Sequence, residues 1–139
     1  MTDKKSVRAI SINNSYKVIL HTEGHTVVSD EPLEEGGSDE GMNPYELLSG
    51  SLASCTAITI QMYLERKGWK VEELVVDVNL KTINEGSLAK NIFERNVIVK
   101  SSLSDAELDR IKYIANACPV SKILEQGNNS VVTTLEKRG

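Results

Sequence analysis

The feature that most limits the fold of this chain is an uninterrupted helical segment from residue 44 to residue 67. Asn43 can accept the first free backbone N–H, Pro44 has the backbone torsion of a first helical residue, and Glu46 complements the positive end of the helix dipole. Gly68 is a typical helix-ending glycine. At about 1.5 Å per residue this helix is roughly 36 Å long. We therefore expect it to cross the whole domain as its central element.

The middle of this segment carries small residues on every side, which suits a helix that other parts of the chain approach closely. Its uncharged stretch, from Leu47 to Leu64, comes near the length of a membrane span. That stretch nevertheless contains polar side chains throughout, namely Ser49, Ser51, Ser54, Thr56, Thr59 and Gln61. We predict a buried helix of a water-soluble fold and no contact with a membrane.

The segments on either side of the helix favour strands, hairpins and short helices. Alternating residues between Ser6 and Asp30, broken at Asn13-Asn14-Ser15 and Glu23-Gly24, predict three short antiparallel strands. Residues 31–42 are acidic and glycine-rich, and we expect a loop there. Residues 74–81 and 91–100 alternate as the two strands of a hairpin whose connection is centred on Glu85-Gly86.

The C-terminal part contains two further helix signals and one strand signal. Ser104 and Glu107 form a capping box, and the apolar spacing that follows predicts a helix that ends before Pro119. A short helix should then run through Ile123 and Leu124. Ser130 to Leu135 is expected to be a last strand. Together these elements predict a single α+β domain over residues 1–139.

Charge and composition exclude some classes of function. Charged residues make up 26% of the chain and the net charge is -4, with both signs interspersed. No basic stripe exists that would hold a phosphate backbone, so we do not expect nucleic acid as a partner. The first residues lack the apolar core of a secretory signal, and we expect a cytoplasmic protein.

The chain has two histidines, His21 and His25, which do not indicate a metal site. Their spacing would converge on a metal only on a helix, whereas their surroundings are strand-like and broken by Gly24. We therefore expect neither a metal nor another cofactor.

The two cysteines, Cys55 and Cys118, are the main candidates for chemistry. A static disulfide is not expected in a reducing compartment, so the pair is either inert or redox-active. A cysteine within an apolar helix, such as Cys55, is commonly only a small buried side chain. Cys118 precedes Pro119 at the start of a helix, where the dipole favours a thiolate.

Two blocks of sequence resemble the signature motifs of the OsmC/organic hydroperoxide resistance family. The first is Asn-Pro-Tyr-Glu-Leu-Leu-Ser-Gly-Ser-Leu-Ala-Ser-Cys-Thr-Ala at residues 43–57, and the second is Ala-Cys-Pro-Val at residues 117–120. The segments around Gly24 to Pro32 and Gly36 to Gly41 resemble the subgroup whose helix begins Asn-Pro-Tyr-Glu-Leu-Leu. The resemblance covers essentially the whole chain.

This resemblance implies a fold and a reaction. The fold is an intertwined homodimer in which antiparallel sheets surround long buried helices. The reaction is reduction of organic hydroperoxides: Cys55, as the peroxidatic cysteine, attacks the O–O bond as a thiolate and becomes a sulfenic acid, and Cys118 resolves it as a disulfide. An external dithiol, possible in this family as a lipoyl group, then reduces the disulfide.

The chain departs from the family pattern near the reactive thiol. The family's glutamate directly follows the proline, but here that residue is Tyr45, and Glu46 lies one place later. Glu46 remains a candidate catalytic residue, although it precedes Cys55 by nine residues and lies on the opposite side of an ideal helix. No arginine occurs between Arg8 and Arg66, where the family's catalytic arginine is expected; Arg8 or Arg95 would have to substitute through the dimer.

Three functions stay open from the sequence. The first is a two-cysteine peroxidase, which requires that folding bring both sulfurs together and that the helix-borne Cys55 lose its proton readily. The second is a non-enzymatic protein that binds an apolar ligand or acts as a slow redox sensor. The third is thiol-dependent hydrolysis or acyl transfer, which needs a general base such as His25 near Cys55.

Overall fold

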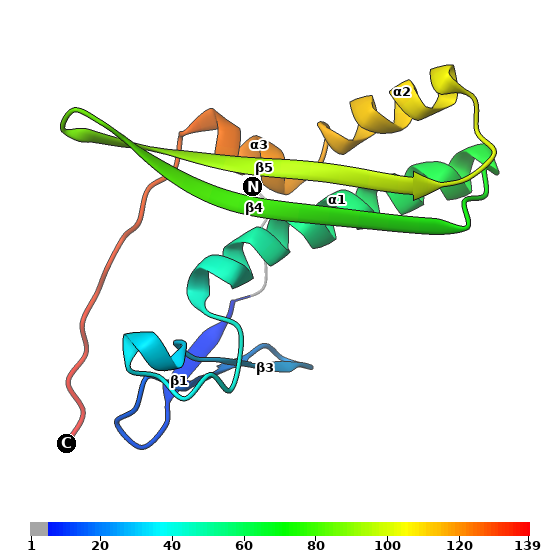
Figure 1. The fold of residues 1–139 in the computed structure, drawn as a ribbon. Coiled ribbons are helices and arrows are strands. Elements are labelled where there is room, and N and C mark those ends of the chain that lie inside the picture. The colour runs from blue at the N-terminus through cyan, green and yellow to red at the C-terminus, as the bar shows by residue number, and fades with distance from the viewer. Residues whose placement is uncertain (1–5) are drawn as a thin grey trace. The chain divides into compact units, whose positions relative to one another are not determined.

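The computed structural model describes residues 6–139, which divide into two compact units with a boundary between Gly50 and Ser51. The two units are described separately, and the expected single domain over residues 1–139 stays a prediction. Helix α1, Pro44–Lys67, begins in the first unit and ends in the second. Its bounds are those predicted from Asn43-Pro44 and Gly68, so the central helix is confirmed (Figure 1).

The first unit contains a small antiparallel sheet. Its strands are β1 (Arg8–Ser11), β2 (Val18–His21) and β3 (Thr26–Ser29), in the order β1-β2-β3. Arg8 pairs with His21 and Val18 pairs with Ser29. The turn between β1 and β2 uses Asn13 and Asn14 at positive φ, as expected of asparagine. The predicted three-stranded sheet is therefore confirmed.

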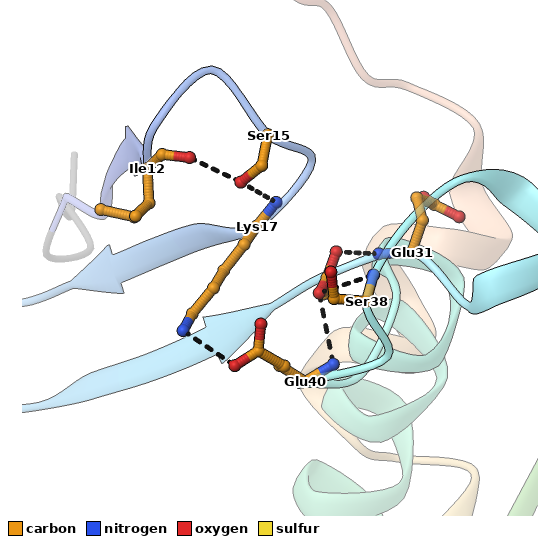
Figure 2. Close-up of polar contacts among 7 residues, drawn as sticks. Ile12, Ser15, Lys17, Glu31, Ser38 and Glu40 are labelled. Atoms are coloured by element: carbon orange, nitrogen blue, oxygen red, sulfur yellow. Dashed lines mark hydrogen bonds and ion pairs between the residues drawn. The ribbon is translucent and has the colours of Figure 1, made fainter.

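A buried carboxylate organises the loop between β3 and α1. Asp30 is only 2% exposed, and its oxygens accept hydrogen bonds from the backbone N–H groups of Glu31 at 2.8 Å and of Ser38 and Glu40 at 3.2 Å. Figure 2 draws these hydrogen bonds to Glu31, Ser38 and Glu40 as dashed lines. The expected loop therefore has a defined shape, and it includes one short 3-10 turn, η1 (Leu33–Glu35).

Two glycines allow this loop to approach its surroundings closely. A Cβ atom on Gly37 would lie 1.9 Å from the carbonyl oxygen of Glu31, and one on Gly41 would lie 2.3 Å from that of Val28. Neither position has room for a side chain. The glycine-rich composition thus serves the folding of the loop.

The second unit is built from the rest of α1, a long hairpin and two helices. Strands β4 (Glu73–Glu85) and β5 (Leu88–Lys100) pair antiparallel in register from Glu73–Lys100 to Glu85–Leu88. The connection is Gly86-Ser87, where Gly86 has a positive φ of 62°. The predicted hairpin is confirmed and is longer than expected.

The core of the second unit lies between α1, the hairpin and α2 (Asp105–Ala115). Ile60 and Leu64 of α1 pack with Ile111 and Ala115 of α2, and the following partly buried residues surround them: Trp69, Val71, Leu74, Val97, Val99, Leu103, Leu108 and Ile114. In Figure 1, α1 and α2 both run along the hairpin. Helix α1 is long and apolar enough to cross a membrane, and two of its buried side chains, Ile60 and Leu64, belong to this core.

Helices α2 and α3 (Pro119–Gln126) follow the hairpin. The Ser104 side chain accepts from the Glu107 N–H, and the Glu107 side chain accepts from the Ser104 N–H, so the predicted capping box is present. Helix α3 begins at Pro119 and ends at Gly127, which has a φ of 63°. The two predicted helices are confirmed, and with the antiparallel sheets they make the expected α+β fold.

The predicted last strand from Ser130 to Leu135 is wrong for the single chain. Residues 127–139 have no regular structure, and Val131, Val132 and Leu135 are 88–97% exposed. The segment has the composition of a strand, but a strand needs a neighbouring strand to accept its backbone hydrogen bonds, and residues 6–139 provide none for it. Figure 1 shows it as an extended trace that leaves α3.

Candidate functional site

The structure brings Cys55 and Cys118 together within the second unit. Cys55 lies on α1, Cys118 precedes the first residue of α3, and their thiols lie close enough to interact with each other. Cys118 is fully buried, whereas Cys55 is partly exposed. Both cysteines are free. Two adjacent thiols can form a disulfide on losing two electrons, and the two-cysteine peroxidase hypothesis requires such a pair.

The junction between α2 and α3 fixes the position of Cys118. The backbone N–H of Cys118 donates to the carbonyl of Ala115 at 3.4 Å, and the Cys118 carbonyl accepts from the Lys122 N–H at 3.2 Å. Pro119 starts α3 because its own missing N–H is not needed in a first turn. The thiol is thereby held between two helices, at the N-terminal end of the second.

The pKa of the Cys55 thiol is raised above its ordinary value. Burial is the main cause, and the hydrogen bond and charge of Cys118 add to it, while the backbone of Val120 and the side chain of Thr59 act in the opposite direction. This direction is opposite to the expectation that the helix-borne Cys55 loses its proton readily. The middle of a helix offers no dipole, and the neighbouring sulfur competes for the negative charge.

The pKa of the Cys118 thiol is lowered. Burial by itself raises it, but four hydrogen bonds together outweigh burial: one from Cys55, two from the backbone and side chain of Ser121, and one from the Thr56 side chain. Hydrogen bonds donated to a thiolate favour the charged form. Of the two thiols, Cys118 is accordingly the one whose charged form is more favoured.

A single arginine connects the groups around Cys118. Arg95, on β5, donates from Nη1 to the hydroxyl oxygens of Thr56, at 3.0 Å, and Ser121, and from Nη2 to the amide oxygen of Asn116 at 2.9 Å. Thr56 and Ser121 are 0% and 3% exposed. Because these partners come from α1, α3 and the end of α2, the guanidinium joins all three helices beside the thiols.

From the sequence, Arg95 is a candidate that acts through a dimer, whereas the structure places it near the thiols of its own chain. A signal was present: Arg95 has the same strand parity as Val97 and Val99, which face the core. A cation on the inward face of an alternating strand needs polar partners inside. Thr56, Ser121 and Asn116 were not predicted, because only the three-dimensional fold brings them together.

Glu46 lies in the first turn of α1 and completes a cap. Its Oε1 accepts from the Asn43 N–H at 2.9 Å, while the Asn43 side chain accepts from the Glu46 N–H at 2.8 Å. This reciprocal pair satisfies two free donors at the helix start. A catalytic role of Glu46 stays a prediction.

His21 and His25 lie in the first unit, at the end of β2 and in the turn before β3. Across residues 6–139, no group of three or more His, Cys, Asp or Glu side chains gathers as a metal site would require. The use of His25 as a base and the expected lack of a cofactor stay predictions.

The sequence from residue 37 to residue 134 matches the family model described as OsmC-like protein. The chain belongs to the OsmC-like family. It is also 30% identical over 104 residues to the uncharacterized protein YmaD of Bacillus subtilis, a match that covers 70% of this chain and 69% of YmaD. The resemblance found in the two cysteine motifs is therefore confirmed as a family relationship.

Solved structures of family members share the fold. An OsmC-like protein from Mycoplasma pneumoniae superimposes with a TM-score of 0.76 at 19% identity, covering 92% of this chain and 91% of the other. The organic hydroperoxide resistance protein OsmC from Legionella pneumophila gives a TM-score of 0.68 at 17% identity, with 92% and 93% covered. At such identities the comparison establishes the OsmC fold.

Proposed function

We propose that this protein is a thiol peroxidase that reduces organic hydroperoxides with Cys55 and Cys118. The observation that carries the proposal is the proximity of two free thiols that are far apart in the sequence, one on α1 and one directly before α3. Membership of the OsmC-like family and the organic hydroperoxide resistance proteins among its structural neighbours support the substrate class. The peroxide is proposed to react at Cys55, because Cys55 is the more exposed sulfur.

The proposed oxidation has two steps. In the first, the Cys55 sulfur attacks the O–O bond of ROOH and takes its OH group, the O–O bond breaks, and the leaving alkoxide takes the thiol proton as ROH. In the second, Cys118 attacks the Cys55 sulfenic acid, forms the S–S bond and releases water or hydroxide. The sulfurs lose two electrons and the peroxide gains them.

An external dithiol completes the cycle by exchange with the Cys55–Cys118 disulfide, which returns both thiols and leaves the reductant as a disulfide. A lipoyl group is the reductant that we propose. Because such a cycle requires a pool of reduced dithiols, the cytoplasm is the proposed location.

We further propose that the protein works as a homodimer. Residues 130–135 carry the apolar side chains Val131, Val132 and Leu135 in an exposed, unpaired segment, and a second copy would supply the missing strand partner. On α1, Ile58 and Met62 are 55% and 66% exposed and would be covered in the same assembly. Light scattering tests this: a monomer at micromolar concentration would contradict the dimer.

The direct test of function is consumption of cumene hydroperoxide or tert-butyl hydroperoxide by the reduced protein, with mass spectrometry of the product. The wild type should form the Cys55–Cys118 disulfide, and Cys118→Ser should accumulate a sulfenic acid at Cys55. Cys55→Ser should lose turnover. Undiminished turnover of Cys55→Ser would contradict the proposal.

A second candidate is a slow redox sensor without turnover, which the raised pKa of Cys55 favours. A sensor would form the same disulfide, but only over minutes and without repeated reduction by a dithiol. Measuring multiple turnovers with reduced lipoamide separates the two: a single stoichiometric oxidation would support the sensor.

A further inference from the structure

The guanidinium of Arg95 has an unusual set of partners. It donates to two hydroxyls and one amide oxygen, all of them neutral. Among residues 6–139, no carboxylate forms an ion pair with it. A positive charge beside a buried cluster is stabilised by a nearby anion. The groups in this cluster that can become anionic are the two thiols.

The direction of the hydrogen bonds selects one of the two sulfurs. Arginine has only donors, so Thr56 and Ser121 must both accept from Arg95. Each hydroxyl then has one proton left to donate elsewhere. Both hydroxyls lie within hydrogen-bonding reach of Cys118, although the Thr56 proton is shared with the carbonyl of Leu52 at 2.7 Å. The positive charge is thus passed to Cys118 and not to Cys55, chiefly through the O–H dipole of Ser121 and to a smaller extent through that of Thr56.

Cys55 contributes the remaining donor. When Cys118 is a thiolate, the S–H of Cys55 can donate to it, and the pair then holds a single proton. Cys118 is fully buried, which keeps its charge away from solvent and dependent on these donors. The ionisable or charged groups of the cluster are the two thiols and Arg95, while α2 and α3 contribute the neutral Asn116 and Ser121.

We propose that Arg95 is a positioning residue that holds the negative charge of the thiol pair on Cys118, acting through the hydroxyls of Thr56 and Ser121. This inference rests on the proposed function for its consequence. The Cys118 thiolate accepts the Cys55 proton as the Cys55 sulfur attacks the peroxide. That proton then passes to the leaving alkoxide, so Cys118 is again a thiolate when it attacks the Cys55 sulfenic acid and displaces hydroxide.

The test is a titration of each thiol alone by the ultraviolet absorbance of the thiolate. In Cys55→Ser, the serine hydroxyl can still donate to Cys118, and the thiolate should form below the ordinary thiol pKa of about 8.5. In Cys118→Ser, the Cys55 thiolate should form at a higher pH than the Cys118 thiolate does in Cys55→Ser. Adding Arg95→Met to Cys55→Ser should raise the midpoint by about one pH unit, a tenfold loss of thiolate at neutral pH. Arg95→Lys should give an intermediate midpoint, because an ammonium keeps the charge without the planar fork.

Either of two results overturns the inference: a lower midpoint in Cys118→Ser than in Cys55→Ser, or an unchanged midpoint on adding Arg95→Met. If Arg95→Met does not fold, Ser121→Ala and Thr56→Val each remove one hydroxyl, and unchanged midpoints in both would equally overturn it. The titration uses no peroxide. A protein without peroxidase activity can therefore still show these shifts, and an active peroxidase can fail to show them, which keeps the two proposals separable.

Discussion

Asp30 and Arg95 are two charged side chains with opposite roles in their units. The carboxylate of Asp30 accepts three backbone N–H groups of its own loop, and no titrating group is needed to complete the arrangement. Arg95 makes as many side-chain hydrogen bonds, but to neutral atoms, and it does so beside two thiols. A charge satisfied by backbone donors stabilises a fold, whereas a charge surrounded by polarisable hydroxyls can control the ionisation of its neighbours.

The largest expected effect on stability is at Asp30. Asp30→Ala leaves three N–H groups without their acceptor, and we expect the free energy of unfolding to fall by about 3 kcal/mol in urea denaturation. Glu34→Ala, in the same loop but exposed, is the control and should change it by less than about 0.5 kcal/mol. The thiol titration should be the same in the wild type, Asp30→Ala and Glu34→Ala. A shifted titration in folded Asp30→Ala would remove the distinction between the two clusters.

The largest expected effect on reactivity is at Arg95. Arg95→Met should slow disulfide formation after one equivalent of hydroperoxide by about tenfold at neutral pH, because a raised thiolate pKa leaves less thiolate. The rate should recover as the pH is raised through the new midpoint. Arg110→Met is the matched control, since Arg110 stacks on Tyr113 and contacts the hydroxyl of Tyr63. Equal slowing in both variants would indicate a general structural effect.

A smaller effect is expected on the Cys55 thiol when its neighbour is removed. Cys118 raises the pKa of Cys55 through a hydrogen bond and through charge, so Cys118→Ser should lower it. We expect alkylation of Cys55 by iodoacetamide at neutral pH to become several-fold faster than in the wild type, as the thiolate fraction grows. Slower alkylation in Cys118→Ser would mean that Cys118 assists the ionisation of Cys55.

The smallest effect is expected at Glu46. In Glu46→Gln the amide oxygen can still accept from the Asn43 N–H, so only the charge near the helix start is lost, at a cost of about 0.5 kcal/mol. Peroxide turnover should be unchanged. A loss of turnover of tenfold or more at unchanged stability would instead establish Glu46 as the catalytic residue that the sequence suggested.

The sequence predicted the elements whose signals are local. Asn43-Pro44 and Gly68 defined α1, and Ser104 with Glu107 defined the start of α2, because caps act within a few residues. The predicted strand over residues 130–135 was wrong for the complementary reason. Strand composition was present there, but a strand depends on a partner that local sequence does not provide.

The candidate site was predicted in part. The family motifs pointed to Cys55 and Cys118, and the structure brings them together, while their catalytic roles stay predictions. The ionisation order could not be predicted, because it depends on Arg95, Thr56 and Ser121, which are far apart in the sequence and meet only in the fold.

The regular turn of α1 also limits how this chain can vary in length. Thr56 faces Arg95 while Ile60 and Leu64, one and two turns later, lie in the core. One residue inserted between Thr56 and Ile60 would rotate the two parts of the helix by about 100° relative to each other. Because both parts of the helix make contacts that depend on their orientation, such an insertion would either disrupt the core or separate the sulfurs. Length changes should therefore be tolerated in the connecting loops and not in this helix.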